Sequence, residues 1–165
     1  MRTIQSRQTG THMSLEKQIT DRAGNDGMSP SAKADGDSVK FLCLLEAEVF
    51  EKEFGKLNTD EVVITNERMR HIREHHPMDY ALFEEYGKKT VEAPDIIIRD
   101  IKNEGTVFMV LRMDSINLNT VVRLSVARTD SPEHKNSVMT FYRIRSKNLT
   151  KLLEKHKVLY NRAEE

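Results

Sequence analysis

The sequence predicts one α+β domain, in which N-terminal helices pack on a four-stranded antiparallel β-sheet meander and a helix ends the chain. Three observations support this fold class. The length of 165 residues is that of about one domain. Between residues 46 and 90 apolar residues recur at helical spacing, whereas after Pro94 the pattern is extended and rich in β-branched residues. Helices followed by a sheet are typical of α+β proteins.

Residues 1–38 differ in composition from the rest of the chain. They are rich in Gly, Ser, Asp, Lys and Asn and poor in aromatic residues, which predicts a disordered leader or linker. The segment THMS leaves open whether residues 1–13 are native or part of a tag. We therefore expect the folded domain to span residues 39–165.

A short strand over residues 39–45 (VKFLCLL) and a helix over residues 46–56 open the folded domain. Apolar residues recur at helical spacing in the second segment, and Gly55 is suited to end the helix. The single cysteine, Cys43, lies in the strand, so we expect it to be buried in an apolar role. One cysteine excludes an internal disulfide and a multi-cysteine zinc site.

Residues 60–65 (DEVVIT) predict a second short strand, followed by a helix that Thr65 or Asn66 caps and that Pro77 ends. A further helix is expected over residues 79–90. We expect its apolar stripe in the core rather than on a base-stacking surface. The stripe consists of Tyr80, Phe83 and Tyr86.

Four extended segments follow Pro94, and residues that favour turns bound each of them. They are residues 96–101, 106–113, 119–128 and 137–145. The separators have the composition of hairpins and short loops, so we expect an antiparallel meander of four strands. A last helix is predicted over residues 148–162, with a buried stripe of Leu149, Leu152, Leu153 and Val158.

The charges are balanced overall but unevenly distributed. Residues 1–95 carry 13 basic and 18 acidic side chains, whereas residues 96–165 carry 13 and 8. A basic C-terminal half suits a polyanion such as nucleic acid, and it equally fits strands and a helix with solvated lysines. The sequence has no run of 18 apolar residues and its start lacks the apolar core of a secretory signal, so we expect a cytoplasmic protein without a membrane partner.

Residues 68–80, RMRHIREHHPMDY, hold three of the six histidines of the chain. His71, Glu74 and His75 spell H-x-x-E-H, in which two histidines one helical turn apart can bind zinc and the glutamate can act as a base. A zinc peptidase needs a third ligand, and no second histidine cluster follows in the sequence. We keep this activity as an alternative and assign no metal ligand.

Three blocks occur in order along the chain: EVVITNERMRHIREHHP, APDIII and HKNSVMTFYRIRSKNLTKLLEKHKVLY. Together, over roughly residues 40–162, they resemble the phage-associated nuclease domains grouped with barnase, EndoU, colicin and RelE-type toxins (the BECR fold). The resemblance implies helices packed on a four-stranded antiparallel sheet and a metal-independent ribonuclease that needs no cofactor. It implies RNA as a partner, with a cognate immunity or antitoxin protein as a second candidate; it leaves the oligomeric state open.

The resemblance also implies a set of site residues. Arg112 stands where the family usually has a lysine, which keeps the charge and changes its geometry. The implied catalytic residues are His71, Arg112, Arg123, Ser137 and Thr140. The implied substrate-binding residues are His76, Lys135, Asn136 and Arg143. His75 is interpreted as a bystander.

These residue types suit RNA cleavage through the neighbouring 2′-hydroxyl. Histidine, with an ordinary pKa near 6.5, can take the hydroxyl proton or protonate the leaving 5′-oxygen. Arginine and hydroxyl donors can stabilise the phosphorane, each by about 10²–10³ in rate. The expected ends are a 2′,3′-cyclic phosphate and a 5′-hydroxyl, and DNA would stay uncut. Which group is the base and which the acid stays open.

Other readings of the same residues stay open as well. Arg112 and Arg123 equally fit a solvated sheet face, and Ser137 and Thr140 equally fit ordinary strand composition. Asn136 fits a turn before a strand. The domain can also be an inactive nuclease fold that binds RNA, or a phage-associated interaction protein, because arginine replaces the usual lysine.

Overall fold

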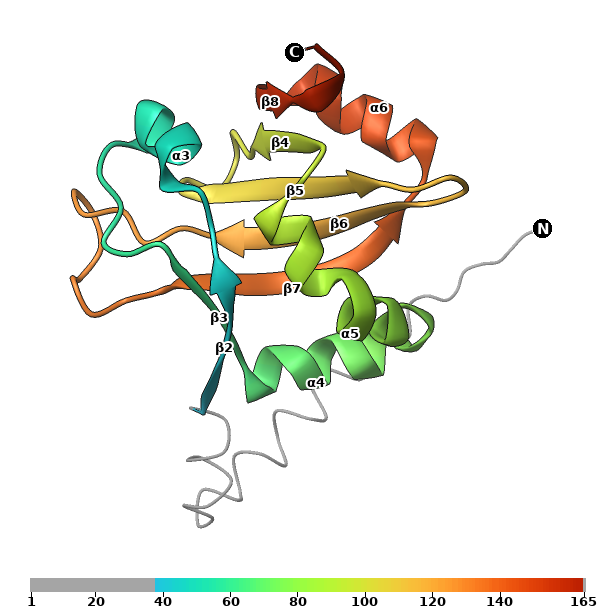
Figure 1. Cartoon of the computed structure of the whole chain (residues 1–165), viewed down its shortest axis with the longest axis horizontal. Helices are drawn as coiled ribbons and strands as arrows, with labels where there is room; N and C mark the ends of the chain where they lie inside the picture. Colours follow the sequence, from blue (N-terminus) through green and yellow to red (C-terminus); the bar gives the residue numbers. More distant parts are fainter. Residues whose placement is uncertain (1–37, 165) are drawn as a thin grey trace. The chain divides into compact units, whose positions relative to one another are not determined.

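The structure is a computed structural model, and it describes residues 38–164 (Figure 1). Apart from Ser38, the leader predicted for residues 1–38 lies outside the described residues, and so does the question of a tag in residues 1–13. Within the described part, no helix is long and apolar enough to cross a membrane.

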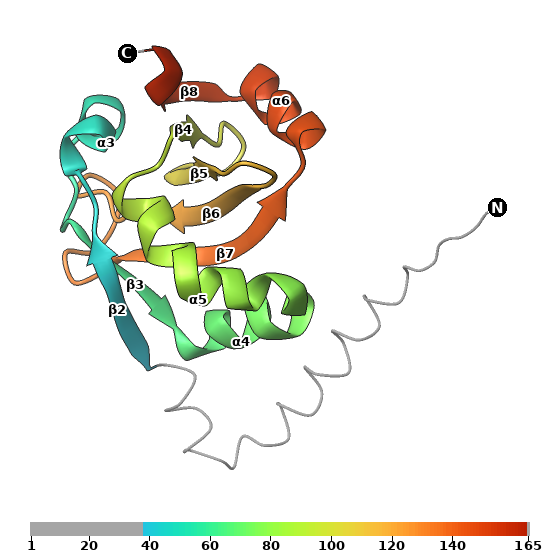
Figure 2. The same ribbon diagram turned by 45° about the vertical axis from the view of Figure 1, so that its right-hand side comes forward.

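One mixed β-sheet of seven strands forms the centre of the fold, in the order β2-β3-β7-β6-β5-β4-β8 (Figures 1 and 2). The strands are β2 Val39–Leu44, β3 Glu61–Thr65, β4 Ile96–Arg99, β5 Thr106–Arg112, β6 Asn117–Arg123, β7 Asn136–Ile144 and β8 Lys157–Asn161. The pair β3–β7 is parallel, and the other neighbouring pairs are antiparallel.

The predicted four-stranded antiparallel meander is therefore wrong, although the class α+β is correct. Strands β4 to β7 are consecutive antiparallel neighbours, as expected, but they make up only the middle of the sheet. Strand β3 adds to the free edge of β7 through Val62 and Val63, and β2 pairs with β3. This parallel pair joins segments that lie far apart in the chain, and no local pattern encodes it.

The C-terminal helix predicted for residues 148–162 is also wrong. Helix α6, Ser146–Lys155, ends at His156, and the chain then forms β8 on the outer edge of β4. This pairing gives hydrogen-bond partners to backbone N–H and C=O groups of β4 that would otherwise have none on an edge strand. Val158, expected in the buried stripe of the helix, lies instead in β8 and is 38% exposed. A short 3₁₀ helix, η2, follows at Arg162–Glu164.

The other helices agree with the sequence pattern, with shifted bounds. They are α3 Ala47–Phe54, α4 Asn66–His75 and α5 Pro77–Glu92. Gly55 ends α3 with φ = +87°, a conformation that favours glycine. Thr65 caps α4, because its hydroxyl accepts a hydrogen bond of 3.1 Å from the backbone N–H of Arg68. Pro77 ends α4 as predicted, and it also begins α5 directly, since proline suits the first helical position.

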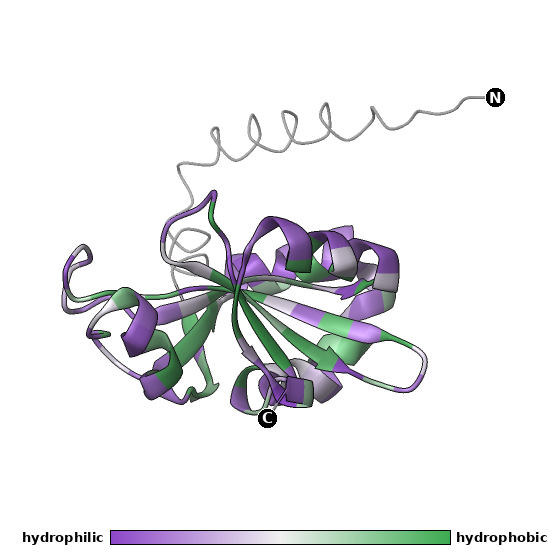
Figure 3. Cartoon of the chain, turned by 90° about the horizontal axis from the view of Figure 1, so that it is seen from above, coloured by the Kyte–Doolittle hydropathy of each residue, from purple (hydrophilic) through white to green (hydrophobic). Residues whose placement is uncertain are grey.

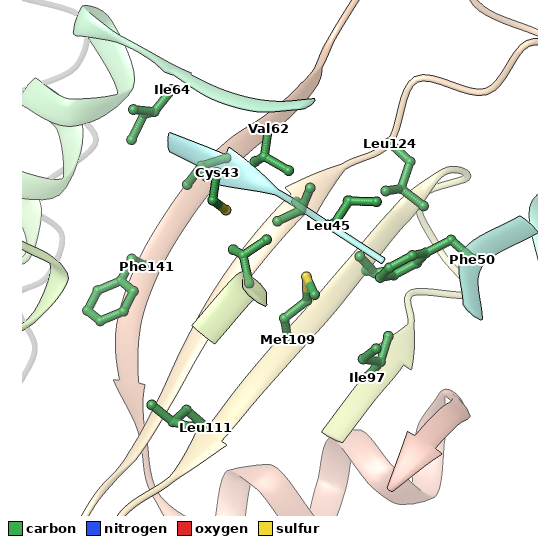
Figure 4. Packing of buried hydrophobic residues seen from close by; sticks show 14 of the residues in the cluster. Cys43, Leu45, Phe50, Val62, Ile64, Ile97, Met109, Leu111, Leu124 and Phe141 are labelled. Carbon is green, nitrogen blue, oxygen red and sulfur yellow. The ribbon is translucent and has the colours of Figure 1, made fainter. Parts of the chain in front are cut away.

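The sheet has two covered faces, which we call the α5 face and the α6 face. The α5 face holds the larger core, to which Met109 and Phe141 of the strands belong (Figure 4). Phe83 and Val91 of α5 belong to the same cluster. The α6 face holds a smaller cluster around Val110, with these further members: Ile96, Ile98, Ile144 and Leu149. The hydropathy colouring shows that the strands are largely apolar, whereas the helices carry long polar stretches (Figure 3).

Cys43 lies in the larger core and is 1% exposed, which confirms the expected buried role. Burial, with a further contribution from the charge of Glu92, raises the pKa of its thiol to about 12. The thiolate is therefore scarce at neutral pH, and Cys43 is unsuited to be a nucleophile.

Candidate active site

The three clustered histidines meet at the end of α4. The ring centroids of His71 and His75, one helical turn apart, are separated by 4.4 Å. The ring of His76 lies 6.1 Å from that of His71, edge to face. The Nδ1 of His75 lies 3.3 Å from the carbonyl oxygen of His71. The cluster thus brings three imidazoles together, including His75, which the sequence had left without a role.

His76 is positioned by the junction between the two helices. It follows the last residue of α4 and precedes Pro77, with φ = −133° and ψ = 57°, so its side chain leaves the line of the helix. Its ring stacks on that of Tyr142 from β7, with centroids 5.9 Å apart and planes inclined by 26°. This stack joins the helix junction to the sheet.

Arg68 extends the histidine row toward the start of α4. Because helical residues three and seven positions apart share one side, Arg68, His71 and His75 lie along the same stripe. The Nη1 of Arg68 lies 3.5 Å from the carbonyl oxygen of Met139 in β7. This contact places the start of the stripe against β7, which agrees with the place of α4 beside this strand (Figures 1 and 2). His75, at the other end of the stripe, is exposed.

Thr140 and Tyr142 lie on the same side of β7, because side chains two residues apart in a strand share a face. This side is the α6 face, since Tyr142 packs against the cluster around Val110. The Oγ1 of Thr140 is buried and has no hydrogen-bond partner within residues 38–164. The predicted residues His71, His76 and Thr140 are thus brought to one region of the molecule.

The environment of His76 changes its protonation. Burial lowers the pKa of His76, the charge of Asp79 opposes this shift, and His75 adds to it. The ring is therefore neutral at pH 7 and able to accept a proton. Asp79 is itself engaged, because the backbone N–H of Arg143 donates to it at 3.2 Å and the guanidinium of Arg143 contacts it.

A metal site of three or more His, Cys, Asp or Glu side chains is not found in the described residues. In this part of the chain His71 and His75 thus have no third donor of these types, as a zinc peptidase would require. The geometry of the cluster suits proton transfer between imidazoles and a bound substrate.

Arg112 and Arg123 do not meet at one phosphate. Arg123 pairs with Thr106 at one end of β5, whereas Arg112 lies at the other end, six residues or about 20 Å along the strand. The guanidinium of Arg123 is held by Asp130, with an N–O distance of 3.0 Å, and by the carbonyl oxygen of Leu124. Arg112 and Arg123, both implied as catalytic residues, therefore lie too far apart to hold the same phosphate.

Three further predicted residues lie near Arg123, away from the histidines. Ser137 is opposite Arg123 in the register of β6 and β7. Lys135 forms an ion pair of 2.7 Å with Glu61. The amide of Asn136 is fully buried and makes three hydrogen bonds to backbone groups that bridge the start of β7 to neighbouring segments. The amide of Asn136 thus has a structural role and is not available to a substrate.

A second group of predicted residues surrounds a polar cavity of about 430 Å³ at the end of the sheet, which we call the basic pocket. Its lining is Asp79, Ser115, Ile116, Asn117, Arg143, Ile144, Arg145 and Ser146. Arg112 is the cross-strand partner of Asn117, so it lies beside this lining. Arg143 and Arg145 lie one and three residues after Tyr142, which connects the pocket to the histidine cluster.

Sequence reasoning missed Arg68 and Tyr142. The three-residue spacing between Arg68 and His71 was available as a signal, because it is the spacing of one helix side. Tyr142 follows Thr140 by two residues, which is the spacing of one strand face. Its stacking with His76 depends on how the helix junction lies over the strand, and no spacing encodes that.

Comparison with known proteins gives no assignment: no family model matches the chain, and neither a curated protein nor a solved structure matches it significantly. The likeness to nuclease domains seen in the sequence therefore stays a prediction.

Proposed function

We propose that this protein is a metal-independent endoribonuclease whose acid and base groups are the histidines at the end of α4. The observation that supports the proposal is the close grouping of the three imidazoles, at 4.4 and 6.1 Å, beside Arg68 and the stacked ring of Tyr142. Attack by a 2′-hydroxyl needs a base, an acid and a cation near the phosphate. The likeness of the same histidine segment to nuclease domains leads to the same reaction class.

His76 is best suited to act as the general base, because burial keeps its imidazole neutral at pH 7. It takes the proton of the 2′-hydroxyl, and the 2′-oxygen attacks the neighbouring phosphorus. The bond from phosphorus to the 5′-oxygen then breaks, and protonated His71 gives its proton to that oxygen. The products are a 2′,3′-cyclic phosphate and a 5′-hydroxyl end.

Arg68 is suited to stabilise the extra negative charge of the phosphorane. It shares a helix stripe with His71, and its contact with the carbonyl of Met139 uses one of five guanidinium N–H donors. Preorganised donors of this kind contribute most where charge develops in the transition state.

The basic pocket is suited to hold a flanking phosphate of the RNA backbone. Arg143 and Arg145 line it and Arg112 adjoins it, so three guanidinium groups lie at this end of the sheet. Asp79 neutralises part of the charge of Arg143. RNA of the cytoplasm is the substrate we propose, and a cognate immunity or antitoxin protein would protect the cell that makes the enzyme.

The test is cleavage of total RNA by the purified full chain in EDTA, followed by sequencing of the ends. We expect cleavage to persist in EDTA and to leave 2′,3′-cyclic phosphate. His76→Ala and His71→Ala should each lower the rate by about 10² or more. His134→Ala, at an exposed histidine of the loop before β7, is the matched control and should cut at the wild-type rate.

Two outcomes would overturn the proposal. If wild type and His76→Ala cut equally, the activity lies elsewhere or in a contaminant. If the protein retards labelled RNA in a gel but never cuts it, the chain is an RNA-binding protein with an inactive nuclease-like surface.

A further inference from the structure

A buried amide without hydrogen bonds lies on the same sheet face as Tyr142. Asn119 is 0% exposed, and neither its Oδ1 nor its Nδ2 has a hydrogen-bond partner in the described part of the chain. The Oγ1 of Thr140 is buried and unpaired in the same sense. Unpaired buried polar groups are unfavourable and rare in folded proteins, so each requires an explanation.

The contrast with Asn136 shows that a structural amide in this fold is fully paired. Asn136 is equally buried, and it makes three hydrogen bonds of 2.8 to 2.9 Å. Asn119 occupies the middle of a central strand, where an apolar residue would pack without this penalty. The polar atoms of Asn119 therefore indicate a role in ligand binding rather than in folding.

The register of the sheet brings the unpaired groups together beside the candidate active site. Asn119 is directly opposite Tyr142, and Thr140 is opposite Val121. Direct neighbours of this kind have Cβ atoms about 5 Å apart, and diagonal ones such as Asn119 and Thr140 about 7–8 Å. One planar ring can span these distances.

The surroundings of the two groups are apolar and partly aromatic. Phe108 and Val110 lie across from Val121 and Asn119 on β5. Phe108, Val121 and Tyr142 are only half-buried, whereas Val110 is fully buried. Single-stranded RNA is read by aromatic stacking and by hydrogen bonds to base edges, and this face offers an aromatic ring beside the two polar groups.

We propose that Asn119 and Thr140 form a nucleobase-recognition site for single-stranded RNA. The amide of Asn119 donates to and accepts from the edge of one base, Thr140 adds a hydroxyl, and Tyr142 stacks on the ring. Adenine is the expected base, because an asparagine amide makes two hydrogen bonds with its N6 and N7. The inference rests on the proposed function, since it assigns the base preference of the same site.

The unpaired atoms are closed from solvent, so the base reaches them only when a half-buried neighbour turns aside. Tyr142 is the neighbour directly opposite Asn119, and its stack on His76 has a centroid distance of 5.9 Å. Rotation of this ring opens Asn119, and the ring then stacks on the incoming base. Binding of the base and release of the His76 ring are therefore coupled.

The test measures binding, by fluorescence anisotropy, of labelled 2′-O-methyl RNA octamers of A, of C and of U to the full chain. These oligomers lack a free 2′-hydroxyl, so binding is read without cleavage. Wild type should prefer the A octamer by about 10-fold or more. Asn119→Leu, which removes both polar atoms at similar volume, should bind all three octamers equally and melt no lower than wild type.

Two matched variants complete the design. Thr140→Val, which keeps the shape of the side chain, should reduce the preference for adenine in part. Asn148→Leu, the same substitution at an exposed position of α6, should leave the preference unchanged. If Asn119→Leu does not fold by circular dichroism, Asn119→Val, a smaller residue suited to a strand, takes its place.

Equal binding of the three octamers by wild type would overturn the inference. An adenine preference that survives in Asn119→Leu would overturn it as well. If that variant keeps the preference and melts at a lower temperature than wild type, the amide of Asn119 binds an internal water. If the protein cuts RNA but shows no base preference that depends on Asn119, the nucleobase site is refuted and the proposed cleavage stands. If the protein shows that preference but cuts no RNA, the proposed cleavage is refuted and the nucleobase site stands.

Discussion

Asp79, at the start of α5, accepts hydrogen bonds from both the backbone N–H and the guanidinium of Arg143, 64 residues later in β7. The backbone N–H of Asp79 in turn donates to the carbonyl oxygen of His76 at 2.8 Å. This pair therefore holds the helix junction against β7, where the ring of His76 stacks on Tyr142. The carboxyl group is 10% exposed, so the pair is only partly screened by solvent.

Asp79→Ala should loosen the junction. We expect a loss of about 1–3 kcal/mol in the free energy of unfolding, because the substitution leaves a backbone N–H and a guanidinium unpaired. RNA cleavage should fall as well, since His76 loses its position. Urea denaturation measures the first effect. The control is Glu92→Ala, which removes a surface pair with Lys88 of 3.9 Å and should cost less than about 0.5 kcal/mol. Equal losses in both variants would contradict the assigned role of Asp79.

Stability should depend on the protonation of His76. Burial lowers the pKa of this ring in the folded state, so the folded protein binds a proton there less readily than the unfolded chain, whose pKa is near 6.5. The stability that neutral His76 contributes is fully present above the pKa of the unfolded chain. It is lost as the pH falls from that pKa toward the lower pKa of the folded protein. The wild type should therefore lose more stability between pH 7 and pH 5 than His76→Gln. His134→Gln, at an exposed histidine, should follow the wild-type curve; parallel curves for all three proteins would refute the assignment.

Asn136→Ala should be among the most destabilising single substitutions in the described chain. The amide accepts from the N–H of Ser125 and donates to the carbonyl oxygens of Thr59 and Glu61. Its removal leaves three backbone groups without partners, at a cost of about 3 kcal/mol or more. Asn103→Ala, which removes one partly buried hydrogen bond to Asp100, should cost about 1 kcal/mol. Thermal or urea unfolding of both variants checks the difference, and similar values would contradict it.

Cys43 should resist alkylation in the native protein. Its thiol is 1% exposed and has a pKa of about 12, so thiolate and access are both scarce at pH 8. Iodoacetamide should label the chain slowly under native conditions and fully in 6 M guanidinium, and because the chain has one cysteine, a single mass shift reports the reaction. Labelling at equal rates in both conditions would contradict the buried position.

Local sequence patterns encode most of the individual helices and strands of this protein. Thr65 and Gly55 mark helix ends because a hydroxyl cap and a positive φ are local properties. The strands after Pro94 follow from β-branched composition and turn residues, and their order as antiparallel neighbours follows from short connections. The grouping of His71, His75 and His76 is local as well, because residues so close in the chain stay close at the end of one helix.

The pairing of distant segments depends on the packing of the whole chain. Strand β3 pairs in parallel with β7, and β8 pairs with β4. Local sequence patterns predict neither of these edge pairings. The same holds for the site, because residues that the sequence implied as one site lie in different places. Arg123 is bound by Asp130, and Asn136 is bound by backbone groups. Tyr142, by contrast, stacks on His76 at the helix junction. Residue spacing encodes which side chains share a face of a helix or strand, whereas the partner of that face depends on register and packing over the whole chain.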